Sequence, residues 1–294
     1  MKHKTLNCNG KLVYIERPIV MGIVNITPDS FYDGGSYTTE VELLKRCEAI
    51  IAEGGKIIDI GAISTRPGAQ DIPAAEELRR LDWAIARVRK HFPEEILSVD
   101  TYRADIAQSM VENYAVDIIN DISSGTLDER MFETVAGLNV PYVLTHMQGA
   151  PSTMQINPAY DNILEDIIAH FSSCLHRLRS LGVKDIIIDP GFGFGKTVEH
   201  NYKLLRHLKD FEIFELPILV GVSRKAMIYK LLETTAQHAL NGTTVANTLA
   251  LIGGADILRV HDVREAVECI QIFQTWSNSK SDDCQYPVRI IKKS

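Results

Sequence analysis

The chain has 294 residues, of which 45% are hydrophobic and 23% charged, the composition of an ordinary globular protein. Its 31 Lys and Arg residues against 38 Asp and Glu residues give a net charge of -7, which disfavours nucleic acid as a partner because phosphate binding needs a basic surface. No apolar stretch is long enough to cross a bilayer, and the N-terminus lacks the apolar segment of a signal peptide. We therefore expect a cytoplasmic protein with no membrane partner, and the five scattered cysteines predict neither a zinc site nor a disulfide framework.

Short β-branched runs alternate along the chain with longer amphipathic stretches. Helices are predicted over 40–53, 74–90, 163–181 and 263–276, where apolar residues recur at helical spacing. The β-branched runs are apolar throughout, which is typical of parallel strands covered by helices on their outer face. Eight such runs are present, at 19–25, 56–61, 95–100, 116–121, 140–146, 185–190, 216–222 and 255–261.

Eight strands separated by helices most simply close into a (β/α)8 TIM barrel, which we predict as a single domain over 19–276. An open doubly wound sheet is the alternative. Residues 1–18 are expected to form an N-terminal extension with a possible hairpin strand at 11–15, and 277–294 a polar C-terminal tail.

Polar residues gather where the predicted strands end. A lone Asp at such a place is often only a helix N-cap, and Ser223 can be read in the same way. A polar group at every one of eight strand ends is harder to explain by capping, and barrel enzymes place their chemistry at this face. The residues in these positions include Asn25, Arg66, Asp100, Asn120, Asp189, Ser223, Lys225, Arg259 and His261.

Local motifs narrow the chemistry further. Arg259 and His261 alternate along one strand, so their side chains share a face, and this pair suits an anion such as a diphosphate. The segment 189–197, DPGFGFGKT, fails the spacing of a phosphate-binding loop, which needs four residues between its two glycines, whereas three separate Gly191 from Gly195. Neither a serine nucleophile elbow nor an H-E-x-x-H zinc motif is present, which disfavours covalent hydrolysis and zinc chemistry.

Several of these segments together resemble one known family. MGIVNITPDSFYDGG, STRPGA, SVDTYR, IINDIS, HMQGAPSTMQ, IIIDPGFGFGK, VGVSRK and ILRVHDV are similar, in order, to segments of the dihydropteroate synthases. The resemblance runs from about Val20 to Val263. It implies a usually dimeric TIM barrel that requires Mg2+. The reaction implied is the condensation of 6-hydroxymethyl-7,8-dihydropterin diphosphate with 4-aminobenzoate to give 7,8-dihydropteroate and diphosphate in folate biosynthesis.

The resemblance also implies roles for individual residues. Asp100, Asp189 and Lys225 would be catalytic. Asn25 would offer its amide oxygen to Mg2+. The pterin would bind Asp100, Asn120, Asp189 and Lys225; the diphosphate would bind Asn25, Thr65, Arg66, Arg259 and His261; and the aminobenzoate pocket would include Phe31, Pro67, Phe194 and Ser223.

The sequence departs from the family pattern at three places. Ile63 stands where a Glu is common, so an acidic contact in the second loop is missing. Tyr32 and Tyr102 replace smaller residues without removing a ligand group. Two alternatives are a pterin-dependent corrinoid methyltransferase of the same fold, which Arg66, Arg259 and His261 together oppose, and a catalytically silent paralogue that only binds pterin, for which Ile63 leaves an opening.

Overall fold

The computed structural model describes residues 4–26, 40–63, 72–150, 154 and 158–279. All eight predicted strands are present in one parallel sheet, with the order β8-β7-β6-β5-β4-β3-β10-β9. Each lies within its predicted run, although several are shorter. Their bounds are β3 Ile19–Asn25, β4 Ile57–Gly61, β5 Ile96–Asp100, β6 Ile118–Asp121, β7 Tyr142–Thr145, β8 Ile186–Asp189, β9 Leu219–Val220 and β10 Ile257–Val260.

The two ends of this sheet meet. A parallel bridge pairs Ile188 of β8 with Ile218, directly before β9, and the Ile188 amide donates to the Pro217 carbonyl at 2.9 Å. The sheet is therefore a nearly closed barrel, which confirms the TIM-barrel prediction. The open doubly wound sheet was the wrong alternative, because such a sheet leaves its two outer strands unpaired.

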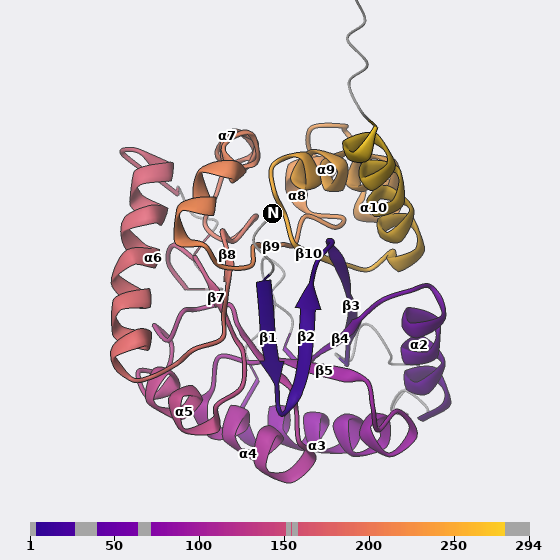
Figure 1. Cartoon of the computed structure of the whole chain (residues 1–294), viewed down its shortest axis with the longest axis vertical. Coiled ribbons are helices and arrows are strands. Elements are labelled where there is room, and N and C mark those ends of the chain that lie inside the picture. The colour runs from indigo at the N-terminus through magenta and orange to yellow at the C-terminus, as the bar shows by residue number, and fades with distance from the viewer. Residues whose placement is uncertain (1–3, 27–39, 64–71, 151–153, 155–157, 280–294) are drawn as a thin grey trace, which may run out of the picture.

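Helices form a ring outside the strands (Figure 1). The four helices predicted from apolar spacing are confirmed to within two residues at each end, and α10 continues to Asn278. Local capping explains one further start: the Thr197 hydroxyl and the His200 side chain form a reciprocal capping box at α7. The helices are α2 Glu40–Ala52, α3 Ala74–His91, α4 Ala104–Tyr114, α5 Met131–Leu138, α6 Ile163–Ser180, α7 Val198–Arg206, α8 Ala226–Tyr229, α9 Leu240–Ile252 and α10 Val263–Asn278, with 3-10 turns η1 Leu208–Phe214 and η2 Ala236–His238.

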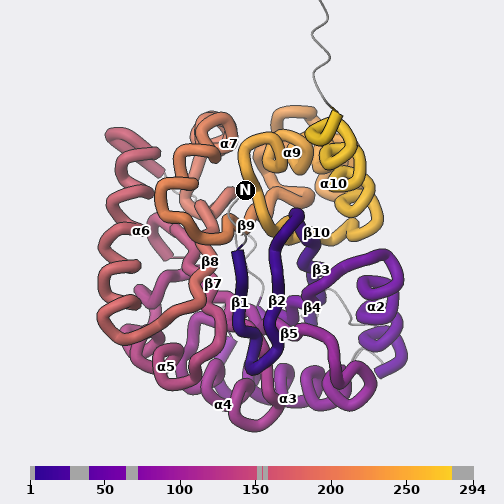
Figure 2. The backbone as a smooth tube through the Cα atoms, in the orientation of Figure 1, coloured from indigo at the N-terminus to yellow at the C-terminus, as the bar shows by residue number. Residues whose placement is uncertain are grey.

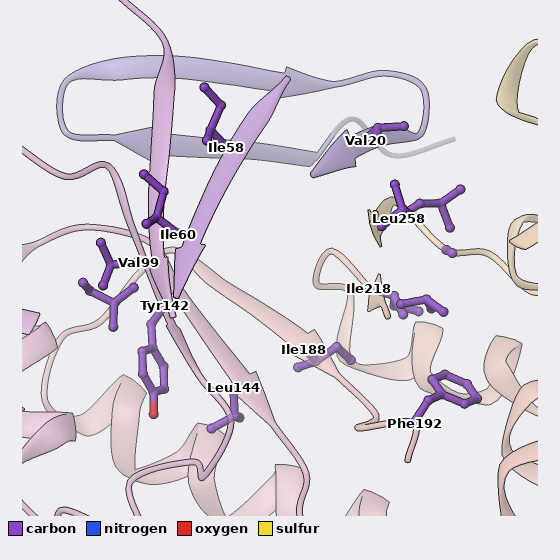
Figure 3. Close-up of a cluster of buried hydrophobic side chains, with 14 of the residues drawn as sticks. Val20, Ile58, Ile60, Val99, Tyr142, Leu144, Ile188, Phe192, Ile218 and Leu258 are labelled. Carbon is purple, nitrogen blue, oxygen red and sulfur yellow. The ribbon is translucent and has the colours of Figure 1, made fainter. Parts of the chain in front are cut away.

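The main hydrophobic core lies between the strands and this ring of helices. Side chains on the outer face of the strands, such as Ile60, Val99 and Leu144, are fully buried there (Figure 3). Burying one such side chain stabilises the fold by roughly 1.5–3 kcal/mol. Burial on both faces of the strands is the reason that the strand sequences are apolar throughout.

A second, smaller core fills the N-terminal end of the barrel. Strands β1 (Lys4–Cys8) and β2 (Lys11–Ile15) form an antiparallel hairpin that lies across the centre of the ring (Figure 2). Its buried residues pack on the inward-facing side chains of the barrel strands. These apolar residues are Leu6, Cys8, Ile15, Met21, Ile57, Ile118, Val143, Ile187, Leu219 and Ile257.

None of the helices within the described residues is long and apolar enough to span a membrane. The apolar packing closes one end of the barrel. The polar residues that follow the inward-facing apolar ones along each strand therefore lie toward the opposite, C-terminal end.

Candidate active site

Neighbouring strands bring the predicted polar residues side by side. In the register of the sheet, Gly61 pairs with Asp100, Asp100 with Asn120, and Thr145 with Asp189. Since alternate residues of a strand share a face, Asp100 and Asn120 point into the barrel, as Ile96 and Ile118 do at its apolar end. The structure thus gathers the predicted carboxylates and amide at the C-terminal mouth.

Burial raises the pKa values of the two predicted catalytic carboxyl groups, and neighbouring cations oppose that shift. Burial raises the pKa of Asp100 to about 7, although the neighbouring Arg259 guanidinium opposes this shift. Burial also raises the pKa of Asp189, and the Lys225 ammonium opposes it. The Gly191 amide donates to Asp189 Oδ1 at 2.8 Å and fixes the orientation of that carboxyl group.

Lys225 reaches the same mouth from the turn after β9. Its Nζ donates to the Phe192 carbonyl at 2.5 Å and lies 4.5 Å from the centre of the Phe194 ring. Burial lowers the pKa of Lys225 to about 8, while the Asp189 carboxylate opposes the shift. An ammonium group with a pKa near neutrality, held next to buried carboxyl groups, is typical of functional sites.

Arg259 is the charged centre of the mouth. Its guanidinium donates through Nε to Asp59 Oδ2 and through Nη2 to Asp100 Oδ2, both at 2.7 Å. Burial alone would lower the pKa of Arg259, but the two carboxylates raise it above its ordinary value. Arg259 therefore keeps its charge inside the barrel.

His261 contributes a hydrogen-bond donor and no charge at neutral pH. Burial, followed by the nearby Arg259, lowers its pKa to about 4. The His261 amide donates to Ser223 Oγ at 3.2 Å, and Ser223 Oγ lies 3.0 Å from His261 Nδ1. If the hydroxyl donates to Nδ1, the ring proton is on Nε2, which can donate to an anion. The expected pair of basic side chains is thus one cation and one neutral donor.

Ser223 is not the N-cap that its position suggested. Helix α8 begins at Ala226, and Lys225 occupies the N-cap position. Arg224, between them, has a left-handed backbone with a φ of 55° and forms a two-point ion pair with Asp262. This ion pair holds the turn after β9 against the end of β10. It therefore reinforces the direct hydrogen bonds between Ser223 and His261, the residues next to Arg224 and Asp262.

The aromatic residue of the predicted aminobenzoate pocket lies at the edge of this mouth. Phe194 is buried with Ile122 and Met154 in a small apolar cluster, separate from the two cores. Asn25 ends β3 and is partly exposed. The other predicted ligands, Phe31, Thr65, Arg66 and Pro67, lie outside the described residues, as does Tyr32.

Two buried polar residues were missed by the sequence reasoning. Asp59 of β4 is fully buried and contacts both Arg259 and Asn120. Lys196 is also buried; its Nζ donates to the carbonyls of His146 (3.3 Å) and Phe194 (3.1 Å), and burial lowers its pKa to about 7. One sequence signal could have found them: each is a charged residue within a segment predicted to be buried, and a buried charge needs a partner.

The mouth therefore combines hydrogen-bond acceptors on Asp100, Asn120 and Asp189 with the donors of Lys225 and Arg259. Within the described residues, no group of three or more His, Cys, Asp or Glu side chains could hold a metal ion. The fold and these side chains define a TIM barrel with buried carboxyl groups and cations gathered at its C-terminal mouth, where barrel enzymes place their chemistry.

Comparison with known proteins identifies that class. The family model described as "Pterin binding enzyme" matches residues 21–261. The dihydropteroate synthase of Escherichia coli K12 is 38% identical over 279 residues, covering 94% of this chain and 98% of the relative. Among solved structures, the Yersinia pestis dihydropteroate synthase with a sulfonamide drug complex has a TM-score of 0.87 and 39% identity, covering 93% and 99% of the two chains. The Xanthomonas albilineans dihydropteroate synthase with 4-aminobenzoic acid has a TM-score of 0.87 and 35% identity, covering 95% and 100%.

The chain belongs to the pterin-binding enzymes and, within them, to the dihydropteroate synthases, transferases of folate biosynthesis. The resemblance seen in the sequence motifs is thereby confirmed. The corrinoid methyltransferase is not favoured, since these relatives and solved structures are synthases.

Proposed function

We propose that this chain condenses 6-hydroxymethyl-7,8-dihydropterin diphosphate with 4-aminobenzoate, releasing 7,8-dihydropteroate and diphosphate. The observation that carries the proposal is the single mouth that holds Asp100, Asn120, Asp189 and Lys225 beside Arg259 and His261. Family membership supplies the reaction type, and this arrangement supports it with groups that suit each part of the substrate.

The pterin ring would bind the carboxylates, the amide and the ammonium. Its amino and N–H groups donate, which Asp100, Asn120 and Asp189 can accept, while Lys225 can donate to the ring carbonyl and to N5. A buried polar edge left without a partner costs about 1–3 kcal/mol, so this set would select the pterin over rings with a different edge.

The diphosphate would lie toward Arg259 and His261, with Asn25 at the neighbouring strand end and Thr65 and Arg66 from the second loop. The aminobenzoate would contact Phe194 and Ser223, with Phe31 and Pro67 from the two loops. The roles assigned to Phe31, Thr65, Arg66 and Pro67 rest on the motif resemblance alone.

The reaction is a substitution at the methylene carbon of the pterin. The C–O bond breaks ahead of C–N bond formation, and its electron pair leaves with the diphosphate. The carboxylates of Asp100 and Asp189 stabilise the positive charge that develops on the pterin, and Arg259 with His261 stabilises the departing anion. The aminobenzoate nitrogen then attacks the methylene carbon and loses its proton to solvent. Each well-placed charged or polar group of this kind lowers the barrier by roughly 3–4 kcal/mol.

The donor chemistry of Asn25 fits a magnesium ion. Its amide oxygen is a hard ligand, and Mg2+ prefers such oxygens while keeping waters and substrate phosphate oxygens as its other ligands. Asn25 ends β3, the strand next to β10, which carries Arg259. When bound, the ion would neutralise charge on the leaving diphosphate; the steps assigned above to protein residues do not depend on its geometry.

We also propose a homodimer. Exposed apolar side chains recur at helical spacing on α9, and further ones lie on α10; the two helices pack side by side (Figure 1). Several large apolar side chains exposed on two neighbouring helices are typical of an interface, and a second copy of the chain would cover them. These side chains are Val245, Leu249, Ile252, Ile272 and Trp276. Sedimentation at micromolar concentration should give twice the chain mass, and monomers would refute the proposal. The cytoplasmic location stays a prediction.

The test of the reaction is direct. Purified protein is incubated with the pterin diphosphate, 4-aminobenzoate and Mg2+, and both products are quantified. We expect dihydropteroate and diphosphate in equal amounts, and less of both after chelation of the metal. If pterin binds but no product exceeds the enzyme-free control, the silent paralogue would be the better interpretation.

A further inference from the structure

Asp59 is a buried carboxylate beneath the proposed substrate site. It lies in the middle of β4, where its side chain points into the barrel like that of Ile57 two residues earlier. Its side chain is 0% exposed, whereas the side chains of Asp100 and Arg259 are 15% and 18% exposed. Asp59 is therefore covered by the residues that reach the mouth and can act on a ligand only through them.

Asp59 contacts two of those residues directly. Its Oδ2 accepts from Arg259 Nε at 2.7 Å, and both its oxygens lie 3.3 Å from Asn120 Nδ2. Asp59 thus links the residue proposed to bind diphosphate with one proposed to bind the pterin ring.

The contact with Asn120 fixes which atom of its amide faces the ligand. A carboxylate can only accept hydrogen bonds, so the Asn120 atom facing Asp59 must be the Nδ2 amine. The Oδ1 acceptor is consequently turned away from Asp59. With the opposite orientation, the Asn120 oxygen would face a buried carboxylate, and neither could donate to the other.

The contact with Arg259 has a similar effect on its guanidinium. Asp59 Oδ2 accepts from Nε and also lies 2.6 Å from Nη2, and Asp100 Oδ2 accepts from Nη2. Among the described residues, Nη1 has no hydrogen-bond partner. A guanidinium fixed in this way has one donor edge left for an anion and little freedom to rotate.

We propose that Asp59 is a positioning residue that orients the Asn120 amide as an acceptor and holds Arg259 with its Nη1 edge free. This inference rests on the proposed function and deepens it, because it names what sets the hydrogen-bonding pattern of the pterin site. The chemical class selected is a ring whose edge donates N–H groups next to an anionic substituent.

The substitution Asp59→Asn changes this pattern with little change in volume. If the new amide oxygen faces Arg259, its amine faces Asn120. Asn120 then faces one oxygen and one amine at residue 59 in place of two oxygens, so its amide is no longer held in a single orientation and can turn its own amine toward the ligand. The pterin would meet a donor where it needs an acceptor.

A matched control comes from the other end of the barrel. Asp117 is also buried, accepts from an arginine (Arg89 Nη2, 2.6 Å) and accepts from the Leu97 amide at 2.9 Å, but it lies before β6 and away from the mouth. Asp117→Asn removes the same charge from a comparable ion pair. It reports the effect of a lost buried carboxylate on folding alone.

The experiment measures equilibrium binding of 6-hydroxymethyl-7,8-dihydropterin without its diphosphate, and separately of inorganic diphosphate, by calorimetry. For Asp59→Asn we expect the pterin Kd to rise by about tenfold or more, and the diphosphate Kd to rise also. For Asp117→Asn both Kd values should stay within about twofold of the wild-type values even where its melting temperature falls. Unchanged pterin affinity in a folded Asp59→Asn variant, or equal losses in both variants, would overturn the proposal.

A double-mutant cycle separates positioning from general damage. In an Asn120→Ala background, Asp59→Asn should cause little further loss of pterin affinity, since the group it orients is already absent. Additive losses would contradict the proposed route through Asn120. Because binding is measured without turnover, a wild-type protein that binds both probes but makes no product would refute the proposed reaction while leaving this test intact.

Discussion

Gly191 occupies a position where a single methyl group should disturb both the fold and the site. It has a φ of +74°, and a Cβ atom added there would overlap the backbone carbonyl oxygen of His146. A left-handed backbone costs an ordinary residue roughly 1–2 kcal/mol. Forcing extra volume into packed structure adds about 1–3 kcal/mol. Gly191→Ala should therefore lower the free energy of unfolding by about 2–5 kcal/mol.

Gly137 offers a control of the opposite sign. It lies within helix α5, and an added Cβ would meet no heavy atom within 4 Å. Gly137→Ala should stabilise the protein by roughly 0.5–1 kcal/mol, because alanine loses less backbone freedom in a helix. Urea denaturation followed by far-UV circular dichroism measures both variants. A Gly191→Ala protein as stable as the wild type would refute the steric argument.

Gly191→Ala should also reduce activity, because the Gly191 amide orients the Asp189 carboxyl group. A folded variant with wild-type turnover would show that this orientation is not needed for catalysis. Lys225→Ala and Asp189→Ala should each sharply lower turnover while the circular dichroism spectrum persists, and near-normal rates in both would contradict the pterin site. The value of kcat/KM for the pterin diphosphate should fall as Asp100 is protonated below pH about 7 and as Lys225 loses its proton above about 8. Lys225→Arg should remove the alkaline decline; if that decline persists unchanged, another group causes it. Tyr142→Phe removes the 2.6 Å hydrogen bond to buried Asp121 and should cost about 1.5–3 kcal/mol of unfolding free energy, measured by urea denaturation; no loss would mean that the remaining donors to Asp121 suffice.

The barrel was predictable because its strands are buried on both faces. That burial makes runs such as 19–25 and 185–190 apolar throughout, and their spacing leaves room for one helix between them. Helix α9 was harder to predict, since its sequence is apolar on its exposed side too, with Leu249 and Ile252 at the surface. Its periodic pattern is correspondingly weak.

The position of the site was predictable for a geometric reason, since the ends of parallel strands meet at one mouth. The protonation states of the site residues and their hydrogen-bond partners could not be predicted from the sequence. The pKa of His261 depends on burial and on Arg259, which no sequence pattern reports. Asp59 lies in an apolar run, and its contacts with Asn120 and Arg259 span large separations in the chain. The alternative interpretation of Ser223 as a helix cap was wrong, because the turn continues for two more residues before α8 begins.

The central claim is that the pterin ring binds the buried carboxylates with its diphosphate toward β10. A crystal structure with a non-reactive pterin diphosphate analogue and Mg2+ tests it most directly. We predict the ring between Asp100, Asn120, Asp189 and Lys225, and the diphosphate within hydrogen-bond distance of Arg259. An analogue bound elsewhere, with these side chains still paired only to one another, would contradict the account.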